Sequence, residues 1–249
     1  MKKIMLTLIS GLIAVVLVAC GGNEESTDAK NDDKAKTEET DQQMEEMQKK
    51  LEEQQIDENK TVVIVNDKEI LGSDYNTVLA AIQGQMLQMG LDPTSKETAE
   101  QAKNQTIDLL VGQTLLLQEA DKKSIKASEA EINKQLDEIK KQFKTEKEYK
   151  TALKESGIDI KTLETQIADD IKIQQYVEKE VPAGEITDKE IQKMYDQYVE
   201  QGKSTGQEVP KLEEIKPQIV QTLEQQKQQE KLAKQVEELK KNATIDIKI

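Results

Sequence analysis

The sequence contains no histidine, no arginine and no tryptophan, and it has a single cysteine, Cys20. Without histidine, the chain lacks the commonest general base, the commonest transition-metal ligand and the usual pH switch. Without arginine, bidentate clamping of a phosphate or carboxylate is unavailable, because all 35 basic residues are lysines. A single cysteine excludes disulfides and cysteine-built zinc or iron–sulfur sites. We therefore expect no catalytic residues, no metal ion and no cofactor, so the composition argues against an enzyme.

Aromatic residues are also scarce, at 2% of the chain, whereas 34% of the residues are charged and the net charge is −14. The core must therefore be aliphatic, which suits helices packed on helices better than a site for carbohydrates or stacked bases. An acidic surface repels nucleic acid and anionic lipid headgroups. We expect no nucleic-acid partner.

The first 19 residues have the pattern of a bacterial export signal, with a basic start and an apolar run over residues 4–18. They end in Leu17-Val18-Ala19-Cys20-Gly21, which resembles the lipobox of bacterial lipoproteins. The resemblance implies removal of residues 1–19 and attachment of diacylglycerol and a fatty acid such as palmitate to Cys20. Two or more acyl chains anchor a protein stably, so the expected location is the extracytoplasmic face of a bacterial cell membrane. The alternative is an ordinary signal peptide, or an uncleaved anchor, with an incidental cysteine.

Residues 20–58 hold the candidate lipidated cysteine and a polar stretch with almost no apolar side chains. Such a composition cannot bury enough surface to offset the entropy of ordering, so it predicts a disordered tether. Met44, Met47 and Leu51 form a weak apolar stripe, which predicts a short helix near the end of this tether.

Residues 59–249 carry the folded part, in which apolar residues recur mostly at helical spacing. A hairpin is predicted over residues 61–71, around the turn Asn66-Asp67. Residues 244–249 alternate strictly between polar and apolar, and an isolated terminal strand needs a partner, so we expect them to pair with the hairpin. The predicted fold class is mostly α: a helical body with a small β-sheet formed by the N-terminal hairpin and the C-terminal strand.

Helices are predicted from apolar periodicity and from start and stop signals. Ser73 is the predicted N-cap of the first, and Ser128, Thr145 and Thr187 each begin a capping-box pattern. A break or hinge is predicted at Val181-Pro182-Ala183-Gly184. The predicted helical ranges are 74–89 ended by Gly90, 96–122, one from Ser128 to about Phe143, one from Thr145 ended by Gly157, 160–180, one from Thr187 through Tyr198 before a loop at 202–209, and 211–242.

The stretch from Gln105 to Ala120 predicts the central helix of the fold. Residues 109–118 carry no charge, and apolar side chains surround this helix nearly all round, including a stripe of Leu109, Leu116 and Ala120. Surface helices keep a polar face, so we expect this one to be buried with the other helices packed against it.

The order of these segments resembles the SurA/PrsA-like family of secreted chaperones and foldases, from about Lys60 to Lys189 and again from Pro210 to the end. The residues that carry the resemblance are Val62-Val63-Ile64-Val65-Asn66-Asp67-Lys68-Glu69-Ile70, Leu115-Leu116-Leu117-Gln118-Glu119-Ala120, Ile125-Lys126-Ala127-Ser128-Glu129-Ala130-Glu131-Ile132, the stretch Tyr149 to Ile158, and Pro210-Lys211-Leu212-Glu213-Glu214-Ile215-Lys216-Pro217-Gln218-Ile219.

Lipid anchoring resembles the PrsA branch of this family. In the family's foldases a parvulin-type prolyl isomerase domain sits between the positions of Tyr198 and Pro210, and such a domain needs on the order of a hundred residues. Residues 199–210 are instead few and polar, and the active-site histidines of parvulins have no counterpart. The resemblance therefore implies the helical SurA N-terminal-like chaperone domain, interrupted near 199–210, without isomerase activity.

The leading hypothesis is an ATP-independent chaperone, or holdase, for unfolded or nascent secreted proteins, held at the membrane by its N-terminal lipid. Methionine adapts to varied partners, which makes the two methionines near the end of the first helix the best candidate client contacts. For each candidate residue the alternative is plain core packing. The candidate residues are Met86 and Met89, followed by Tyr149, Tyr176, Tyr195 and Tyr198.

Three other classes are weighed against this hypothesis. A structural or adaptor lipoprotein with one dedicated protein partner needs the same exposed apolar groove, so the sequence does not separate it from a chaperone. A foldase relative with vestigial peptidyl-prolyl isomerase activity is opposed by the missing histidines. A solute-binding lipoprotein of a transporter needs strands and helices alternating in two lobes around a cleft, whereas at most three strands are predicted.

Overall fold

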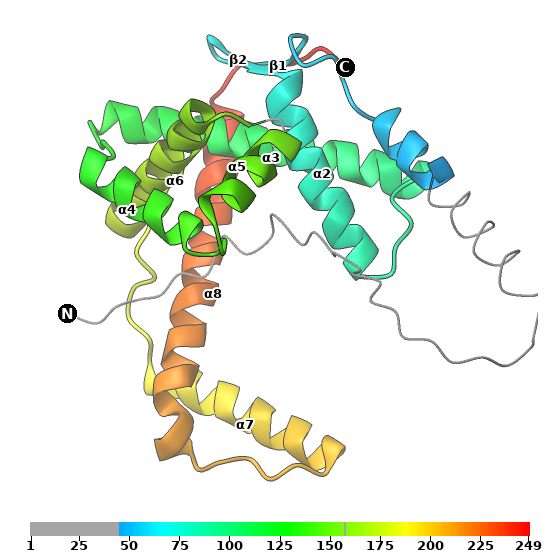
Figure 1. Cartoon of the computed structure of the whole chain (residues 1–249). Coiled ribbons are helices and arrows are strands. Elements are labelled where there is room, and N and C mark those ends of the chain that lie inside the picture. Colours follow the sequence, from blue (N-terminus) through cyan, green and yellow to red (C-terminus); the bar gives the residue numbers. More distant parts are fainter. Residues whose placement is uncertain (1–44, 157) are drawn as a thin grey trace, which may run out of the picture. The chain divides into compact units, whose positions relative to one another are not determined.

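The structure is a computed structural model that describes residues 45–156 and 158–249. The predicted signal peptide, Cys20, most of the predicted tether and Gly157 lie outside these residues. The described chain is mostly helical with one small antiparallel sheet (Figure 1), which confirms the predicted fold class. It divides into two compact units. Unit 1 runs up to Val111 and includes Ile245–Ile249, and unit 2 is Gly112–Thr244.

Unit 1 contains the sheet, in the strand order β2-β1-β3. Strand β1 (Thr61–Val65) pairs antiparallel with both β2 (Lys68–Leu71) and β3 (Ile245–Ile247). The turn between β1 and β2 places Asn66 at φ 56°, a left-handed conformation that asparagine tolerates better than most residues. The predicted hairpin and its closing C-terminal strand are therefore confirmed.

Helix α2 (Gly72–Gln88) packs on β1 and β2, but it begins differently from the prediction. Ser73 lies inside the first turn, and the N-cap residue, Leu71, supplies no side-chain hydrogen bond. Instead, the amides of Gly72 and Ser73 donate to the carbonyls of Lys60 and Glu58, at 2.8 and 3.0 Å. Backbone carbonyls of the preceding segment thus satisfy the free amides of the helix start, which a sequence pattern for side-chain caps does not detect.

The segment before β1 is held on α2 by side-chain amides. Asn76 accepts from the Ile56 amide at 2.9 Å and donates to the Ile56 carbonyl at 2.7 Å. Gln83, which is buried, donates to the side chain of Gln54 at 3.0 Å. These bonds attach the segment 54–58 to α2, so this segment is part of unit 1. Its composition had predicted that it belongs to the tether. The short helix predicted near the tether's end is present at 45–52.

Helix α3 (Lys96–Lys122) has the predicted bounds, but it is not buried all round. Its first half buries one side, with Ala102, Thr106 and Leu110, and exposes the other. Leu109 is 47% exposed, which corrects the prediction that it belongs to a buried stripe. The boundary between the units falls within α3, between residues 111 and 112, and the buried side changes along the helix. Periodicity alone cannot show that the two halves bury different faces.

Unit 2 holds the remaining helices. Two of the three predicted capping boxes are complete, at Ser128 and Thr187, whereas at Thr145 the Glu148 carboxylate accepts instead from the amide of Lys144. Helix α6 has the predicted bounds, and α7 continues four residues into the predicted loop before Gly206 ends it at φ 69°. The bounds are α4 (Glu129–Lys140), α5 (Glu146–Glu155), α6 (Ile160–Glu180), α7 (Asp188–Thr205) and α8 (Leu212–Lys241).

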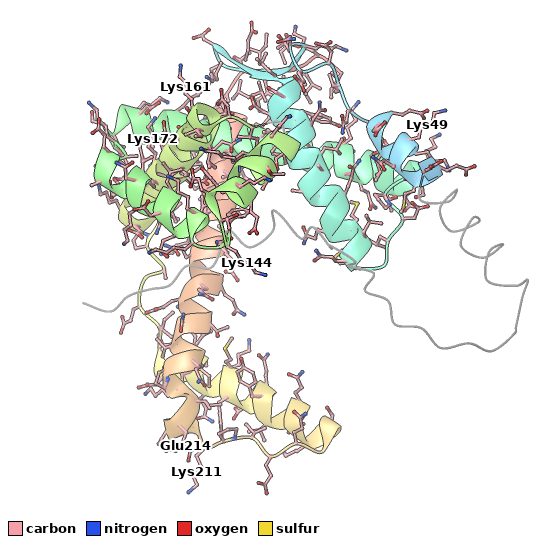
Figure 2. The ribbon with its side chains drawn as sticks, viewed as in Figure 1. Lys49, Lys144, Lys161, Lys172, Lys211 and Glu214 are labelled. Carbon is pink, nitrogen blue, oxygen red and sulfur yellow. The ribbon has the colours of Figure 1, made fainter. Side chains whose placement is uncertain are left out.

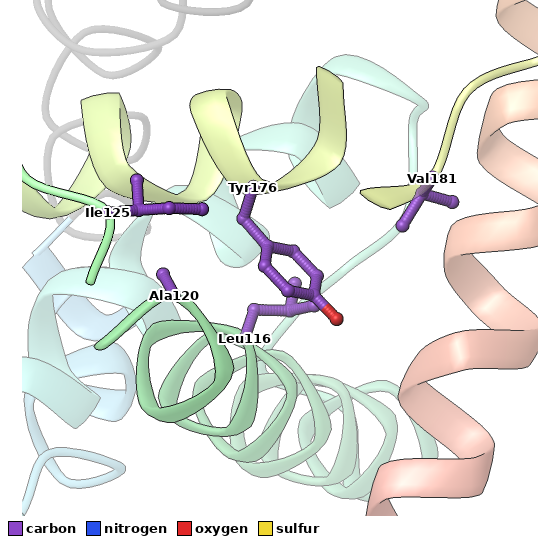
Figure 3. Packing of buried hydrophobic residues seen from close by; sticks show 5 residues of the cluster. All are labelled: Leu116, Ala120, Ile125, Tyr176 and Val181. Atoms are coloured by element: carbon purple, nitrogen blue, oxygen red, sulfur yellow. The ribbon is translucent and has the colours of Figure 1, made fainter. Parts of the chain in front are cut away.

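Two apolar clusters form the core of unit 2. In the first, side chains from the second half of α3 meet α6 and the C-terminal half of α8 (Figure 3). The buried members of this cluster are Leu116, Ala120, Ile125, Tyr176 and Val181. In the second, Leu136 of α4 packs against Ile167 and Ile171 of α6. Val181, the first residue of the predicted break, is thus a core residue, and the chain turns away from the helix only after it.

Helices α7 and α8 pack against each other within unit 2. Ile191 of α7 and Ile219 of α8 are both buried, with 4% and 1% of their surfaces exposed. Lys227 of α8 reaches the Glu190 carboxylate at 2.7 Å and the Glu185 carbonyl at 2.7 Å. Four more apolar residues in the N-terminal half of α8 are partly buried: Leu212, Ile215, Val220 and Leu223. Lys211 and Glu214, at the start of the helix, are exposed (Figure 2).

Candidate functional site

Exposed large apolar side chains are few in the described chain, and three of them occur together at the end of α2. Leu87, Met89 and Leu91 are exposed by 41%, 62% and 40%. We call these three residues the α2-terminal patch. The other large apolar side chains exposed to this degree are spread over α3, α6, α7 and β3: Leu109, Ile160, Tyr198 and Ile247.

A glycine-ended turn positions the α2-terminal patch. Gly90 adopts φ 75°, and its amide donates to the Leu87 carbonyl at 3.0 Å, while the Leu91 amide donates to the Met86 carbonyl at 2.9 Å. This pair of bonds is the Schellman motif, in which a left-handed residue reverses the chain after a helix. The predicted stop at Gly90 is confirmed. The turn holds Leu91 next to the last turn of the helix instead of letting the chain continue outward.

The outward face of α2 continues the patch as a surface without charge. No residue from Tyr75 to Leu91 is charged, in a chain with 34% charged residues. The inner stripe of α2 is buried, whereas Ala81 and Gln88 are exposed, and a side chain added at Gly84 would meet nothing within 4 Å. Residues at positions 77, 81, 84 and 88 lie along one side of a helix. This side of α2 is therefore uncharged and is at least partly open to solvent.

Acidic residues lie at the two ends of the charge-free stretch. Asp74 lies in the first turn of α2, where the helix dipole favours a negative charge. At the other end, Asp92 accepts hydrogen bonds from the Thr94 hydroxyl at 2.7 Å and from the Thr94 amide at 2.9 Å. These bonds, with a smaller contribution from Lys50, hold the pKa of Asp92 below its ordinary value. Asp92 therefore stays ionised at neutral pH.

The structure places the candidate contact residues in different environments. Met86 is buried on the inner side of α2, while Met89 belongs to the exposed patch. Tyr149 of α5 and Tyr176 of α6 are 1% and 3% exposed, so neither can touch a partner in this conformation. On α7, Tyr195 is half-buried and Tyr198 is 40% exposed.

Each buried tyrosine has local neighbours of its own. The Tyr149 ring meets Phe143 edge-on at 5.6 Å, and its hydroxyl is the one buried side-chain polar atom of the described chain that has no hydrogen-bond partner. The Tyr176 hydroxyl accepts from Gln235 at 3.4 Å. Burial raises the pKa of Tyr149 and of Tyr176, so both hydroxyls stay neutral. The Tyr195 hydroxyl donates to the Pro210 carbonyl at 3.2 Å, closing the connection between α7 and α8.

Sequence reasoning missed Leu87 and Leu91 as candidate contacts. Helical spacing placed Met86 and Met89 on one apolar side, but only Met86 is buried, since α2 ends at Gln88 and Met89 is the C-cap residue beyond its last turn. The absence of charge from residue 75 to residue 91 was the available signal. Such a run in a highly charged chain marks a whole helix face rather than single residues.

A depression beside Val181 and Pro182 is lined by Glu180 and by four residues of α8: Lys231, Lys234, Gln235 and Glu238. Within the described ranges there is no group of three or more acidic or cysteine side chains able to hold a metal ion. None of the described helices is both long enough and apolar enough to cross a membrane.

The described chain is mostly helical with a small three-stranded sheet, and it exposes an apolar patch at the end of α2. Residues 54–177 match the SurA-like N-terminal domain. The match covers unit 1 from residue 54 to residue 111, together with the second half of α3, α4, α5 and most of α6 in unit 2. The chain belongs to the SurA/PrsA-like family.

Curated relatives carry the names of both branches. The foldase protein PrsA of Clostridium botulinum (strain Loch Maree / Type A3) is 25% identical over 208 residues, which cover 79% of this chain and 54% of the relative. The chaperone SurA of Vibrio parahaemolyticus is 34% identical over 84 residues, covering 34% of this chain and 19% of that protein. The chain therefore spans about half the length of the PrsA relative it matches.

A solved structure of SurA-like chaperones, described for PEB4 and Cj1289 of Campylobacter jejuni, also aligns with this chain. The sequence identity is 12%, the TM-score is 0.47, and the alignment covers 76% of this chain and 99% of that one. A likeness of this size carries no argument about the function of the chain.

Proposed function

We propose that this protein is an ATP-independent chaperone, a holdase that binds unfolded or nascent secreted proteins and keeps them from aggregating. Two kinds of observation support the proposal. The family includes proteins named as chaperones and foldases, and the α2-terminal patch offers exposed Leu87, Met89 and Leu91 beside an uncharged helix face. The patch is the single structural observation on which the proposal rests, because apolar surface left in water favours burial against an apolar partner.

The proposed location is the extracytoplasmic face of the bacterial membrane, through lipid on Cys20. The support is the basic start, the apolar run and the lipobox-like ending of residues 1–21. A tether keeps the chaperone close to emerging clients and so raises its effective concentration there. Replacing Cys20 with alanine should abolish incorporation of labelled palmitate. A wild-type protein that incorporates no labelled palmitate would contradict lipid anchoring without affecting the chaperone proposal.

The chaperone proposal is tested with the soluble form, residues 22–249, mixed with an unfolding client protein whose aggregation is followed by light scattering. We expect suppression at stoichiometric amounts without ATP. The double substitution Leu87→Glu and Met89→Glu should weaken suppression, because two carboxylates at the patch oppose the burial of apolar client side chains.

The matched control adds the same two charges elsewhere in unit 1. Gln101→Glu and Gln105→Glu lie on the exposed side of α3, away from the α2-terminal patch in sequence and on a different helix. This control should suppress aggregation as well as the wild-type protein does. A wild-type protein that protects none of several clients would overturn the general-chaperone proposal.

We propose that the chain has no enzymatic activity, since it contains no histidine and α7 is joined to α8 by only residues 206–211. A prolyl isomerase assay on a proline-containing peptide should give the uncatalysed rate. Isomerase activity that remains with the purified protein would instead favour a foldase relative with vestigial isomerase activity.

A structural or adaptor lipoprotein with one dedicated partner is the second candidate function. The same α2-terminal patch favours it, because three exposed apolar side chains can also fit a single folded surface. Affinity purification from the native membrane distinguishes the two. One protein recovered in a fixed stoichiometric ratio, together with no suppression of client aggregation, would support the adaptor.

A further inference from the structure

The outward face of α2 differs in chemistry from an ordinary exposed helix face. The residues along this face are small or uncharged, and they include Thr77, Ala81, Gly84 and Gln88. The exposed side chains of Leu87, Met89 and Leu91 lie at its C-terminal end. Small side chains let another chain approach the helix closely. Any partner of this face must replace water over a surface that offers no charge of its own.

Charges around the face narrow the choice of partner. Asp74 stands at one end of the charge-free stretch and Asp92 at the other, and carboxylates outnumber lysines in unit 1 as a whole. A second copy of this chain would bring the same carboxylates against each other. Nucleic acid and anionic lipid would also be repelled. The electrostatic complement is a polypeptide with basic side chains on both sides of an apolar centre.

The length of the outward face of α2 sets the length of the polypeptide segment that it can bind. Fourteen residues separate Asp74 from Gln88, and a rise of 1.5 Å per residue makes this distance about 20 Å. An extended chain rises about 3.3 Å per residue, so about six residues span it. The exposed amides of Gln85 and Gln88 can donate to and accept from the backbone of such a segment. An extended, unfolded chain needs these bonds because its backbone groups are not paired internally.

We propose that the outward face of α2, between Asp74 and Asp92, binds extended unfolded segments in which lysine or arginine flanks an apolar centre of about six residues. This proposal rests on the proposed holdase function and names the class of client segment that the surface selects. The apolar centre lies over Ala81, Gly84 and the α2-terminal patch. The flanking basic groups lie towards Asp74 and Asp92.

The test measures binding of labelled peptides to the full chain in nanodiscs of zwitterionic phosphatidylcholine, by fluorescence anisotropy. The probes are unfolded peptides that share one apolar centre and differ only in flanking lysine, glutamine or glutamate. We expect the lysine-flanked peptide to bind tightest and the glutamate-flanked peptide weakest, with about a tenfold span at low salt. The span should shrink as salt is raised, because salt screens exposed charges.

Matched variants locate the binding surface. The double substitution Gln85→Lys and Gln88→Lys should weaken binding of the lysine-flanked peptide about five- to tenfold and remove the preference over the glutamate-flanked one. The control, Gln101→Lys and Gln105→Lys, adds the same charges at exposed positions of α3 and should leave the preference intact. Circular dichroism and thermal unfolding of each variant check that both proteins remain folded.

The outcomes separate this inference from the proposed function. Equal affinity for the three peptides, or equal loss in both double variants, overturns the α2 inference while suppression of aggregation leaves the holdase proposal standing. A wild-type chain that binds no peptide and suppresses no aggregation overturns both.

Discussion

Helices α2 and α7 each leave a long face in water, but the two faces have different chemistry. Helix α2 carries a single charged residue, Asp74, at its start. Helix α7 alternates acidic and basic residues along most of its length, including Glu190, Lys193, Asp196 and Glu200. In the chain as a whole a third of the residues are charged, so α7 shows the ordinary surface of this protein and α2 shows the exception.

The two helices are also held in place by different forces. Helix α2 is fixed by close backbone packing at Gly72 and by the paired amide bonds of Asn76. Helix α7 is fixed by a thin apolar contact at Ile191 and by exposed ion pairs, of which Lys227 with Glu190 is one. A helix held by packing needs no charges on its outer face, which leaves that face free for a partner. We therefore expect α2 to respond to steric changes and α7 to respond to pH and salt.

The largest effect is expected at the start of α2. A side chain at Gly72 would lie 2.0 Å from the Asp57 carbonyl oxygen and 2.8 Å from its carbon. Because these are backbone atoms that cannot rotate away, Gly72→Ala should destabilise unit 1 by about 3 kcal/mol. Urea unfolding, followed with amide hydrogen exchange of unit 1, measures the change.

Gly84→Ala in the same helix is the control for Gly72→Ala. A side chain at Gly84 meets open space, so this substitution should stabilise α2 by about 0.5–1 kcal/mol through a lower entropy of the unfolded chain. Similar effects at the two glycines would show that helix propensity, and not close packing, decides the cost.

A smaller loss is expected from Asn76→Ala. The substitution leaves the Ile56 amide and carbonyl without their side-chain partner in a partly buried place. The expected cost is about 1–3 kcal/mol, and it should not change with salt because neither group is charged. Asn104→Ala, at an exposed position of α3, should have almost no effect on the unfolding midpoint. A marked salt dependence for Asn76→Ala would break the contrast with α7.

Gly90→Ala tests the turn that positions the α2-terminal patch. An alanine at φ 75° costs about 1–2 kcal/mol, and relaxing that strain would move Leu91 away from the helix end. We expect a small loss of stability and a weaker suppression of client aggregation. Gly90→Asn should recover part of both, since asparagine tolerates this conformation. Unchanged activity in Gly90→Ala would show that the turn geometry is unimportant for the patch.

The smallest change in stability at neutral pH is expected for a substitution on α7, and its size should depend on pH. Hydrogen bonds from Lys227 and from Thr187 lower the pKa of Glu190 from 4.5 to about 2. A depressed carboxylate pKa stabilises the fold above pH 4.5, and this contribution is lost as the pH falls towards about 2. The protection of α7 amides against exchange, relative to the unfolded chain at the same pH, should therefore fall as the pH is lowered through that window in the wild-type protein.

Glu190→Gln should speed exchange in α7 at pH 6 and match the wild type near pH 2. High salt at neutral pH should reduce the difference, because the pair with Lys227 is exposed to screening. Glu200→Gln, which removes a local pair with Lys203 on the same helix, is the control and should show little change. A difference that persists at pH 2 would mean that packing, rather than charge, holds α7.

The sequence predicted most of the fold because its signals are local. Apolar periodicity placed α3 and α6 at their observed bounds, and the capping boxes at Ser128 and Thr187 marked the starts of α4 and α7. The alternation of residues 244–249 predicted a strand, and the lack of other strands predicted that it pairs with the 61–71 hairpin, whose strand β1 is the observed partner. Each of these features depends on a few neighbouring residues.

The errors arose where distant backbone atoms supply what a local pattern cannot show. The start of α2 is satisfied by carbonyls of residues 58 and 60 rather than by Ser73. Leu109 is exposed because the two halves of α3 bury different sides. For the candidate site, the methionine pattern led to Met89, but it could not separate Met89 from the buried Met86 or include Leu87.

By itself, the amino-acid sequence determined the helical class, the small sheet and the chemical limits of the chain, because composition and short-range periodicity carry that information. It also contained the charge-free run from Tyr75 to Leu91. Only the tertiary structure decided which side of that run lies in water. Close packing at Gly72 and the amide bonds of Asn76 fix the rotation of α2, and this rotation buries Met86 while it exposes Leu87 and Met89.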